Sequence, residues 1–327
     1  ADMKLAPDHL MLISAIADAN PNVTLVLHTG SAIETRQFEH QIPAILQAWL
    51  SGEGGGEALA RVLFGEANPS GKLSETFPIR LEHNPTFETF PGTKATVAYQ
   101  EGLFTGYRYY DTKALPVQYP FGHGLSYSQF TLGDLTYHAD ARQVSFSITN
   151  QGPTEGAEVV QLYIHDEAST YRRPVHELKA FRKVRLVPGE KRTVTLQLDA
   201  HAFAYYVPHL NGFAEESGRF ELRLGFSSRD IRQTRWVTVE SDTDVRILPT
   251  LGDTVQDWLS DSRTAPVLQN ELDRLNFTAS HPMYGIALGF PIPQLIQFIP
   301  HMGFDESDAT DVQRSLEQQW GQIQALA

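Results

Sequence analysis

Between Phe130 and Glu240 the sequence alternates apolar and polar residues with a period of two, in short segments separated by turn sequences. Four of these segments place an apolar residue at every second position: Val144/Phe146/Ile148, Val160/Leu162/Ile164, Val194/Leu196/Leu198 and Phe220/Leu222/Leu224. A strand with one buried face has this period, whereas an amphipathic helix needs 3.6 residues. The pattern therefore predicts an antiparallel β-sandwich of immunoglobulin-like or fibronectin-like type.

The segment before this region has the character of an α/β fold. A helix is expected over Asp8–Ala19, and a short strand over Val23–Leu27 follows it. This strand is continuously apolar, as strands buried on both faces of a parallel sheet usually are. A second apolar run covers Ile42–Leu50, and three glycines then lead into a helix over Glu57–Phe64. We expect this region to form part of a layered α/β domain.

The last ~80 residues are expected to be helical. Apolar residues recur at three-to-four spacing in Gly252–Leu259, Ala265–Leu275 and Ala309–Leu326. Between them lies an apolar arm with several prolines, Phe277–Phe304, which should not remain exposed to water. We expect it to pack on another body, such as a further domain or a second subunit, through five large side chains: Phe290, Leu295, Ile296, Phe298 and Ile299.

Charge and cysteine content exclude several classes of function. Acidic residues outnumber basic ones by 39 to 26, so the net charge of −13 argues against nucleic-acid binding and against binding to anionic membranes. The absence of cysteine excludes disulfides, zinc–thiolate sites and a cysteine nucleophile. No apolar run reaches the length of a membrane span. A cytoplasmic bacterial location is the expectation, and secretion is left open.

Several short motifs carry little functional information. Gly65–Lys72 resembles a phosphate-binding loop, but it has five residues between its glycines and Leu73 after its lysine, so it departs from that pattern. Gly54–Gly56 could hold an anion at a helix N-terminus, although a tight turn explains it better. His28 follows a predicted strand, and Ser31 lacks the context of an esterase nucleophile. The histidines show no metal-binding spacing, so no metal is expected.

Aromatic and charged residues are densest in Tyr99–Gly102 and Tyr107–Asp111. Aromatic rings and carboxylates are the groups that bind sugar rings, which have apolar faces and hydroxyl edges. The same residues could instead fill a junction between domains, with Glu101 and Arg108 forming an ion pair. Both interpretations stay open at this point.

Three long motifs in the first half resemble the C-terminal half of glycoside hydrolase family 3, the β-glucosidase family. They are ILQAWLSGEGGGEALARVLFGEANPSGKLSETFP, YQEGLFTGYRYYD and YPFGHGLSYSQF. The later segments ITNQGPTEGAEVVQLYIHD, RPVHELKAFRKVRLVPGE and LGFSSRDI are similar to the fibronectin type III-like domain of that family. The resemblance covers residues 1 to about 240. Ser51–Gly54 and Thr105 depart from the common pattern of the family, at positions not expected to carry chemistry.

This resemblance implies a retaining glycosidase built from a (β/α)8 barrel, an (α/β)6 sandwich and the fibronectin-like domain. Its barrel supplies an Asp nucleophile, and a Glu of the α/β sandwich acts as acid and base. Asp2–Pro7 resembles the segment that follows this Glu, so both catalytic carboxylates are expected before Ala1 and none in this chain. Glu53 and Glu101 are the weaker candidates for the acid. Substrate-binding residues are not assigned, and no cofactor is implied.

The expected domains are residues 1–125 as part of the α/β sandwich, 126–248 as the fibronectin-like β-sandwich and 249–327 as a helical extension. The implied substrates are β-linked glucosides or short oligosaccharides. The implied partners are a barrel, in the same or a separate chain, and a second subunit in a homodimer. The leading hypothesis is therefore the C-terminal portion of a β-glucosidase, inactive alone. The alternative is a free-standing carbohydrate-binding or assembly module without a catalytic role.

Overall fold

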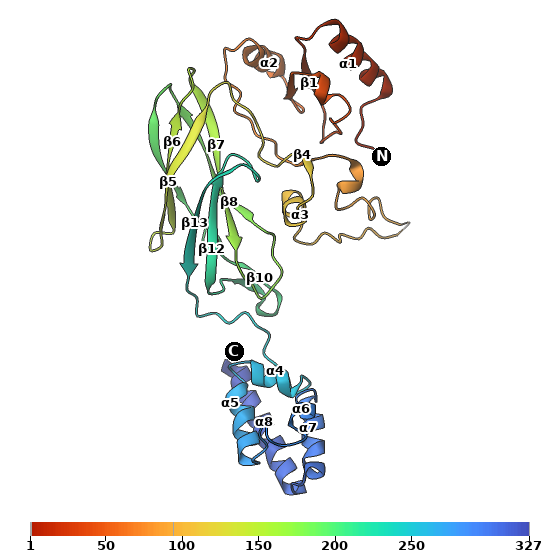
Figure 1. Cartoon of the computed structure of the whole chain (residues 1–327), viewed down its shortest axis with the longest axis vertical. Coiled ribbons are helices and arrows are strands. Elements are labelled where there is room, and N and C mark those ends of the chain that lie inside the picture. The colour runs from red at the N-terminus through yellow and green to blue at the C-terminus, as the bar shows by residue number, and fades with distance from the viewer. Residues whose placement is uncertain (1, 94, 327) are drawn as a thin grey trace. The chain divides into compact units, whose positions relative to one another are not determined.

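The computed structural model describes residues 2–93 and 95–326 (Figure 1). The chain divides into two compact units, Ala1–Val245 and Arg246–Ala327. We call the first the larger unit and the second the helical unit. The larger unit begins with an α/β part and continues into antiparallel sheets, and the helical unit contains helices α4 to α8.

The α/β part contains a pair of parallel strands with a helix before and after it. Helix α1 (Pro7–Ala19) begins with a proline, whose fixed φ suits the first helical turn. Strands β1 (Thr24–Leu27) and β2 (Ala44–Gln47) pair in parallel, and α2 (Gly55–Leu63) follows β2. A small apolar core lies between these elements, made of Ile13, Leu27, Ile33, Phe38 and Ile42.

The helix predicted over Asp8–Ala19 and the strand predicted over Val23–Leu27 are both present, with bounds that differ by one residue. A further segment connects this part to the sheets: β3 (Phe77–Pro78) pairs antiparallel with β4 (Val117–Tyr119), and α3 (Tyr107–Thr112) lies between them in sequence. Short 3-10 helices cover Glu39–Gln41 and Leu81–His83.

The region that alternates with a period of two forms antiparallel sheets, as predicted. One sheet has the order β5-β6-β9 and the other the order β13-β12-β7-β8. Their bounds are β5 (Phe130–His138), β6 (Gln143–Asn150), β7 (Gly156–Asp166), β8 (Glu177–Leu186), β9 (Lys191–Gln197), β12 (Gly218–Gly225) and β13 (Ile231–Val239). A small hairpin, β10 (Tyr205–Val207) with β11 (Gly212–Ala214), encloses the 3-10 helix Pro208–Leu210.

The core of these sheets is formed by the alternating apolar positions. Val144, Phe146 and Ile148 of β6 are at most 1% exposed, and residues of β7 and β12 join them in one cluster. Burial of each such side chain is worth about 1.5–3 kcal/mol. The core-facing positions follow the alternation, but β7 is buried on both faces from Val160 to Ile164, since Gln161 and Tyr163 on its other face are at most 3% exposed.

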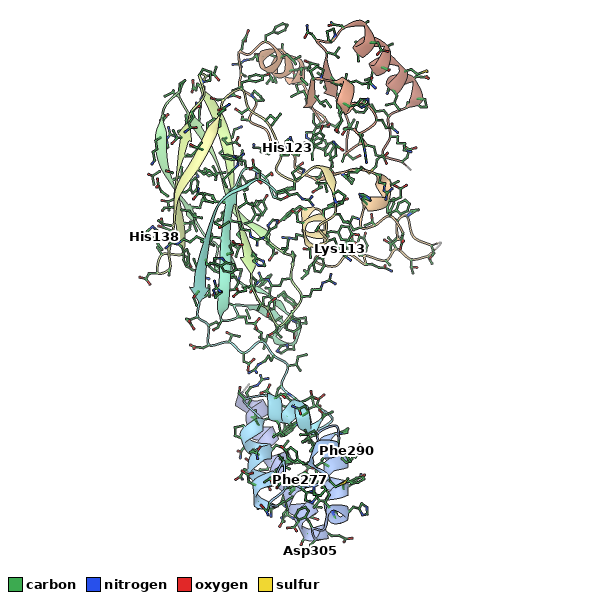
Figure 2. The ribbon with its side chains drawn as sticks, in the orientation of Figure 1. Lys113, His123, His138, Phe277, Phe290 and Asp305 are labelled. Atoms are coloured by element: carbon green, nitrogen blue, oxygen red, sulfur yellow. The ribbon has the colours of Figure 1, made fainter. Side chains whose placement is uncertain are left out.

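The helical unit has its own apolar core. Its helices are α4 (Val255–Ser260), α5 (Ala265–Arg274), α6 (Tyr284–Ala287), α7 (Ile292–Phe298) and α8 (Glu306–Leu326), with a 3-10 turn over Ile299–Met302. Thr254 and Asp257 form a capping box that fixes the start of α4. Trp258, Leu268, Leu272, Phe277 and Leu316 are at most 2% exposed (Figure 2 labels Phe277).

The expectation that the apolar arm packs on another body is wrong for most of its side chains. Leu295 and Ile299 are 1% exposed within the core of the helical unit itself, and Phe290 and Ile296 pack against that core. These side chains are buried or partly buried, as the energetic argument requires, but the surface that buries them belongs to the helical unit itself. The prolines do not leave the segment extended, because they start short helices such as α7 that turn their apolar sides inward.

Among the helices that the structure describes, none is both long enough and apolar enough to cross a lipid bilayer.

Candidate functional site

The carboxyl ends of β1 and β2 form one edge of the parallel pair, and the loops that leave from it carry several of the candidate residues. His28 and Thr29 follow β1, and the loop with Glu53 follows β2. The Gln47 side-chain amide donates to the Thr29 hydroxyl at 2.9 Å and joins the end of β2 to the loop after β1. Ligands of α/β folds bind at this edge. Three residues considered in the sequence as possible site residues, His28, Ser31 and Glu53, are exposed at this edge.

Local geometry explains one of the three glycines after β2, Gly55, whereas a side chain at Gly54 or Gly56 would meet nothing within 4 Å. A side chain at Gly55 would bring its Cβ within 2.4 Å of the Ser51 hydroxyl oxygen. The residue is also buried at the start of α2. This close approach supports the interpretation of Gly54–Gly56 as a tight turn into a helix.

The segment that resembles a phosphate loop contacts the β-sheets instead. The Lys72 ammonium lies 2.7 Å from the Glu158 carboxylate of β7, and the two side chains are only 11% and 7% exposed. The same ammonium donates to the Gly124 carbonyl at 2.7 Å. The Asn68 side chain accepts from the Tyr127 amide at 3.0 Å. This motif therefore connects the α/β part to the first residues of the sheets.

The second half of the aromatic and charged cluster also faces the sheets. Tyr107 stacks on Phe121 with ring centroids 4.7 Å apart, and its hydroxyl accepts from the Leu178 amide at 2.7 Å. The Thr112 hydroxyl accepts from the Val175 amide at 2.9 Å. Helix α3 thus docks on β8 and the loop before it. We call the Lys72–Glu158 and α3 contacts together the seam.

Asp111 is the ionised centre of the seam. Its carboxylate lies 2.6 Å from Arg229 Nε and 3.1 Å from His176 Nε2. Burial opposes ionisation of this carboxyl group, but the hydrogen bonds from His176 and Arg229 outweigh it and hold the pKa of Asp111 below its ordinary value. Arg229 also donates to the carbonyls of Tyr110 and Leu115, at 3.2 and 2.9 Å. It therefore binds the backbone at the end of α3 and just after it, where the Tyr110 carbonyl also accepts from the Leu115 amide at 2.9 Å.

The expected ion pair between Glu101 and Arg108 is not formed. Arg108 Nη2 lies 3.4 Å from Glu177 of β8 instead. One carboxylate oxygen of Glu101 is buried without a hydrogen-bond partner. Nearby, Tyr99 and Leu103 are 83% and 59% exposed. The junction interpretation therefore fits Tyr107–Asp111, and the sugar interpretation is left to the exposed loop around Tyr99.

Two further carboxylates were not singled out in the sequence. Glu75 accepts from the Ala32 amide at 2.8 Å, and burial raises its pKa despite this bond. Glu39 accepts from the Tyr119 hydroxyl at 3.0 Å, and burial together with this carboxylate raises the pKa of Tyr119 to about 12. No spacing signal could reveal these pairs, because each joins residues far apart in the chain.

We expect Asp111→Asn to lower the free energy of unfolding by about 1–3 kcal/mol at pH 7, since a charged hydrogen-bond acceptor is lost from a mostly buried site. The folded-state pKa of Asp111 is depressed, so its contribution is complete above the ordinary value of 3.8 and is lost as the pH falls through the folded-state pKa. The difference between the variant and the wild type should therefore shrink in acid. Urea unfolding at several pH values measures it, with the exposed Asp140→Asn as control. An equal loss at every pH would contradict the assignment.

Comparison with known proteins defines the class of both parts of the larger unit. Residues 1–127 match the Glycosyl hydrolase family 3 C-terminal domain, and residues 158–228 match the Fibronectin type III-like domain. The chain therefore carries the C-terminal domain of glycoside hydrolase family 3 followed by a fibronectin type III-like domain. It is homologous to β-glucosidases of this family over about 80% of its length.

Among its relatives are Thermostable beta-glucosidase B of Acetivibrio thermocellus and an Exo-alpha-(1->6)-L-arabinopyranosidase of Bifidobacterium breve. The first is 45% identical over 81% of this chain and 36% of the relative, and the second is 40% identical over 79% and 34%. The chain thus spans about a third of the length of these relatives.

Solved structures give the same result. The GH3 beta-glucosidase of Bifidobacterium adolescentis has a TM-score of 0.76 and 36% identity, covering 81% of this chain and 40% of that one. The beta-glucosidase of Kluyveromyces marxianus in complex with glucose has a TM-score of 0.70 and 38% identity, covering 73% and 29%.

Proposed function

We propose that this chain is the C-terminal portion of a retaining β-glucosidase-like enzyme that cleaves terminal, non-reducing β-glycosyl residues. The proposal rests on the match to β-glucosidases. The match covers about four fifths of this chain but only about a third of each relative. The chain would supply one wall of an active site whose other wall is a (β/α)8 barrel. Its substrates would be β-linked glucosides or short oligosaccharides.

In this proposal the α/β part is a portion of an (α/β)6 sandwich. Its exposed apolar side chains support that assignment. Met11, Leu12 and Ile16 of α1 are 64%, 58% and 45% exposed, and Leu50 and Phe64 are more than 80% exposed. A parallel sheet is normally covered by helices on both faces. The remaining layers of the domain are the partner that would bury these residues.

The domain bounds that we propose are 1–125, 126–248 and 249–327. The strands β4 and β5 on either side of the first boundary belong to different sheets, which supports it. The division of the chain after Val245 lies close to the second.

We also propose that the catalytic Asp and Glu lie upstream of Ala1. A retaining mechanism needs two carboxyl groups about 5–5.5 Å apart, one as nucleophile and one as acid and base. Glu39, Glu75, Asp111 and Glu158 each hold structural hydrogen bonds or ion pairs, which argues against a catalytic role for them. Glu53 and Glu101, the weaker candidates for the acid, lie on different loops.

The chain alone should therefore not hydrolyse aryl β-glucosides above the buffer rate. The measurement is release of p-nitrophenol by a sample whose intact mass excludes a second polypeptide. Turnover that survives this check and is lost in Glu53→Gln or Glu101→Gln would contradict the proposal and make that residue the acid. The same result would exclude the alternative of a non-catalytic module.

A further inference from the structure

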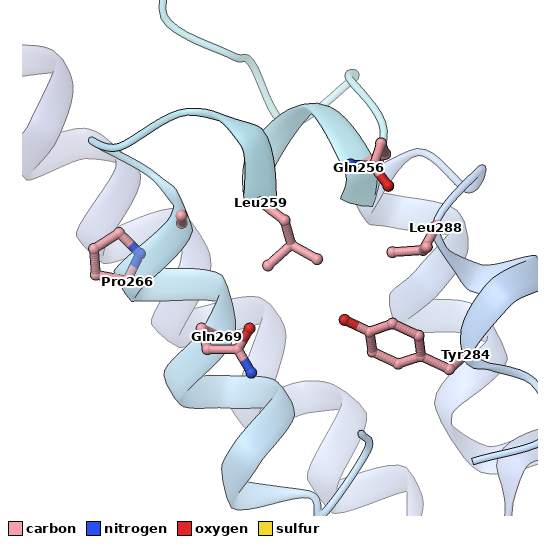
Figure 3. Close-up of a pocket in the computed structure, with 7 residues that line it drawn as sticks. Gln256, Leu259, Pro266, Gln269, Tyr284 and Leu288 are labelled. Atoms are coloured by element: carbon pink, nitrogen blue, oxygen red, sulfur yellow. The ribbon is translucent and has the colours of Figure 1, made fainter. Parts of the chain in front are cut away.

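The helical unit contains an open pocket of about 500 Å³ (Figure 3). This volume lies within the range of about 300–1,000 Å³ that is usual for small-molecule sites. Its walls come from three elements: Gln256 and Leu259 of α4, Pro266 and Gln269 of α5, and Tyr284 and Leu288 at α6. We call it the tail pocket.

The walls of the tail pocket are held by the core beneath them. Leu259, Tyr284 and Leu288 are partly buried and pack against the apolar core of the unit. The Tyr284 ring lies 5.6 Å from the ring of Phe277, which is 1% exposed. Figure 3 shows Leu259 and Tyr284 projecting into the same space from different helices. The apolar part of the pocket is therefore anchored to buried side chains.

The polar groups of the tail pocket have hydrogen-bonding capacity to spare. Among the described residues the Tyr284 hydroxyl has no hydrogen-bond partner, and it points into the pocket (Figure 3). The Gln256 amide nitrogen donates to Ser260 Oγ at 3.1 Å, and the Gln269 amide nitrogen donates to Asp273 Oδ1 at 2.8 Å. These bonds hold the nitrogens, so the two amide oxygens are left as acceptors for a ligand.

The lining carries no Asp, Glu, Lys, Arg or His. A charged ligand would find no counter-charge in the pocket, and a purely apolar one would make no use of the hydroxyl and the amide oxygens. A neutral molecule that combines an apolar ring face with several hydroxyl groups matches all of these features.

We propose that the tail pocket is a non-catalytic binding site for a neutral sugar. The apolar face of a pyranose ring lies over Leu259 and Leu288, and its hydroxyls donate to the amide oxygens of Gln256 and Gln269. The Tyr284 hydroxyl bonds a further ring hydroxyl. The tail pocket belongs to the helical unit and the proposed active-site wall to the larger unit, and the proposal does not depend on the chain being part of a glycosidase.

The test is a titration of the full 327-residue chain with cellobiose through the millimolar range, followed by the NMR signals of labelled leucine methyl groups. The signals of Leu259 and Leu288 should shift and saturate. Tyr284→Phe removes a single hydroxyl from the pocket and should weaken binding about 2- to 10-fold, as should Gln269→Ala. Tyr206→Phe removes the same atom from the β10–β11 hairpin and should leave the affinity unchanged.

Two comparison ligands make the outcome decisive. Cyclohexanol offers an apolar ring with one hydroxyl, and glucose 6-phosphate adds charge to a sugar. Both should bind at least several-fold more weakly than cellobiose at these methyl groups. Equal binding of cyclohexanol would overturn the sugar assignment in favour of a general apolar pocket. Unshifted Leu259 and Leu288 signals, or an affinity that Tyr284→Phe leaves unchanged, would overturn the site itself.

Discussion

Lys72→Met should lower the free energy of unfolding of the larger unit by about 3–5 kcal/mol. The substitution leaves the buried Glu158 carboxylate without its partner at 2.7 Å, and an uncompensated buried charge is strongly destabilising. For a unit of this size the melting temperature should fall by roughly 10 °C. The helical unit should melt as in the wild type, because its core is separate.

A double variant distinguishes loss of the ion pair from loss of packing. Lys72→Met with Glu158→Gln removes both charges, and the glutamine keeps the acceptor that binds the Val159 amide. Because the buried charge is gone, the double variant should recover more than half of the lost stability. Lys191→Met is the matched control: the side chains of its ion pair with Asp134 are 61% and 68% exposed, so water screens the pair and its loss should change the stability little. A double variant as unstable as the sum of its single variants would contradict the account.

The sheets were the most predictable part of the fold. A period of two specifies which residues face the core, and Val144, Phe146 and Ile148 are buried as the pattern predicts. The parallel pair was also recognisable, because β1 is a short aliphatic run between turn residues. In both cases the signal for a strand is local. Burial follows from it in the sheets, whereas in β1 only Leu27 is buried.

The partners of the seam could not be predicted in the same way. Lys72 was considered only as part of a phosphate-loop motif, and Arg108 was paired with Glu101 rather than Glu177. Arg229 reaches Asp111 from the turn between β12 and β13. Each of these pairs joins residues that only the packing of the α/β part on the sheets brings together, so spacing along the sequence carries no information about them.

The helical unit shows a second limit of what the sequence can predict. The pattern predicts three of its helices, α4, α5 and α8, whereas the prolines of Phe277–Phe304 predict an apolar arm that needs another body to cover it. In the structure Pro291 caps a short helix and Leu295 enters the unit's own core. Apolar content predicts that a segment is buried, whereas the identity of the surface that buries it depends on tertiary packing.

The proposed function is tested most directly by restoring the upstream region. The chain is joined to the part of Thermostable beta-glucosidase B of Acetivibrio thermocellus that precedes the matched residues, since the two proteins are 45% identical where they match. Hydrolysis of p-nitrophenyl β-glucoside is then compared between this chimera and the chain alone, with circular dichroism and melting curves showing that both are folded. We expect the chimera to exceed the chain alone by about a million-fold or more, and to release β-glucose first, as retention requires. A folded chimera without activity, or equal activity of the chain alone, would contradict the assignment of this chain as the non-catalytic wall of a β-glucosidase.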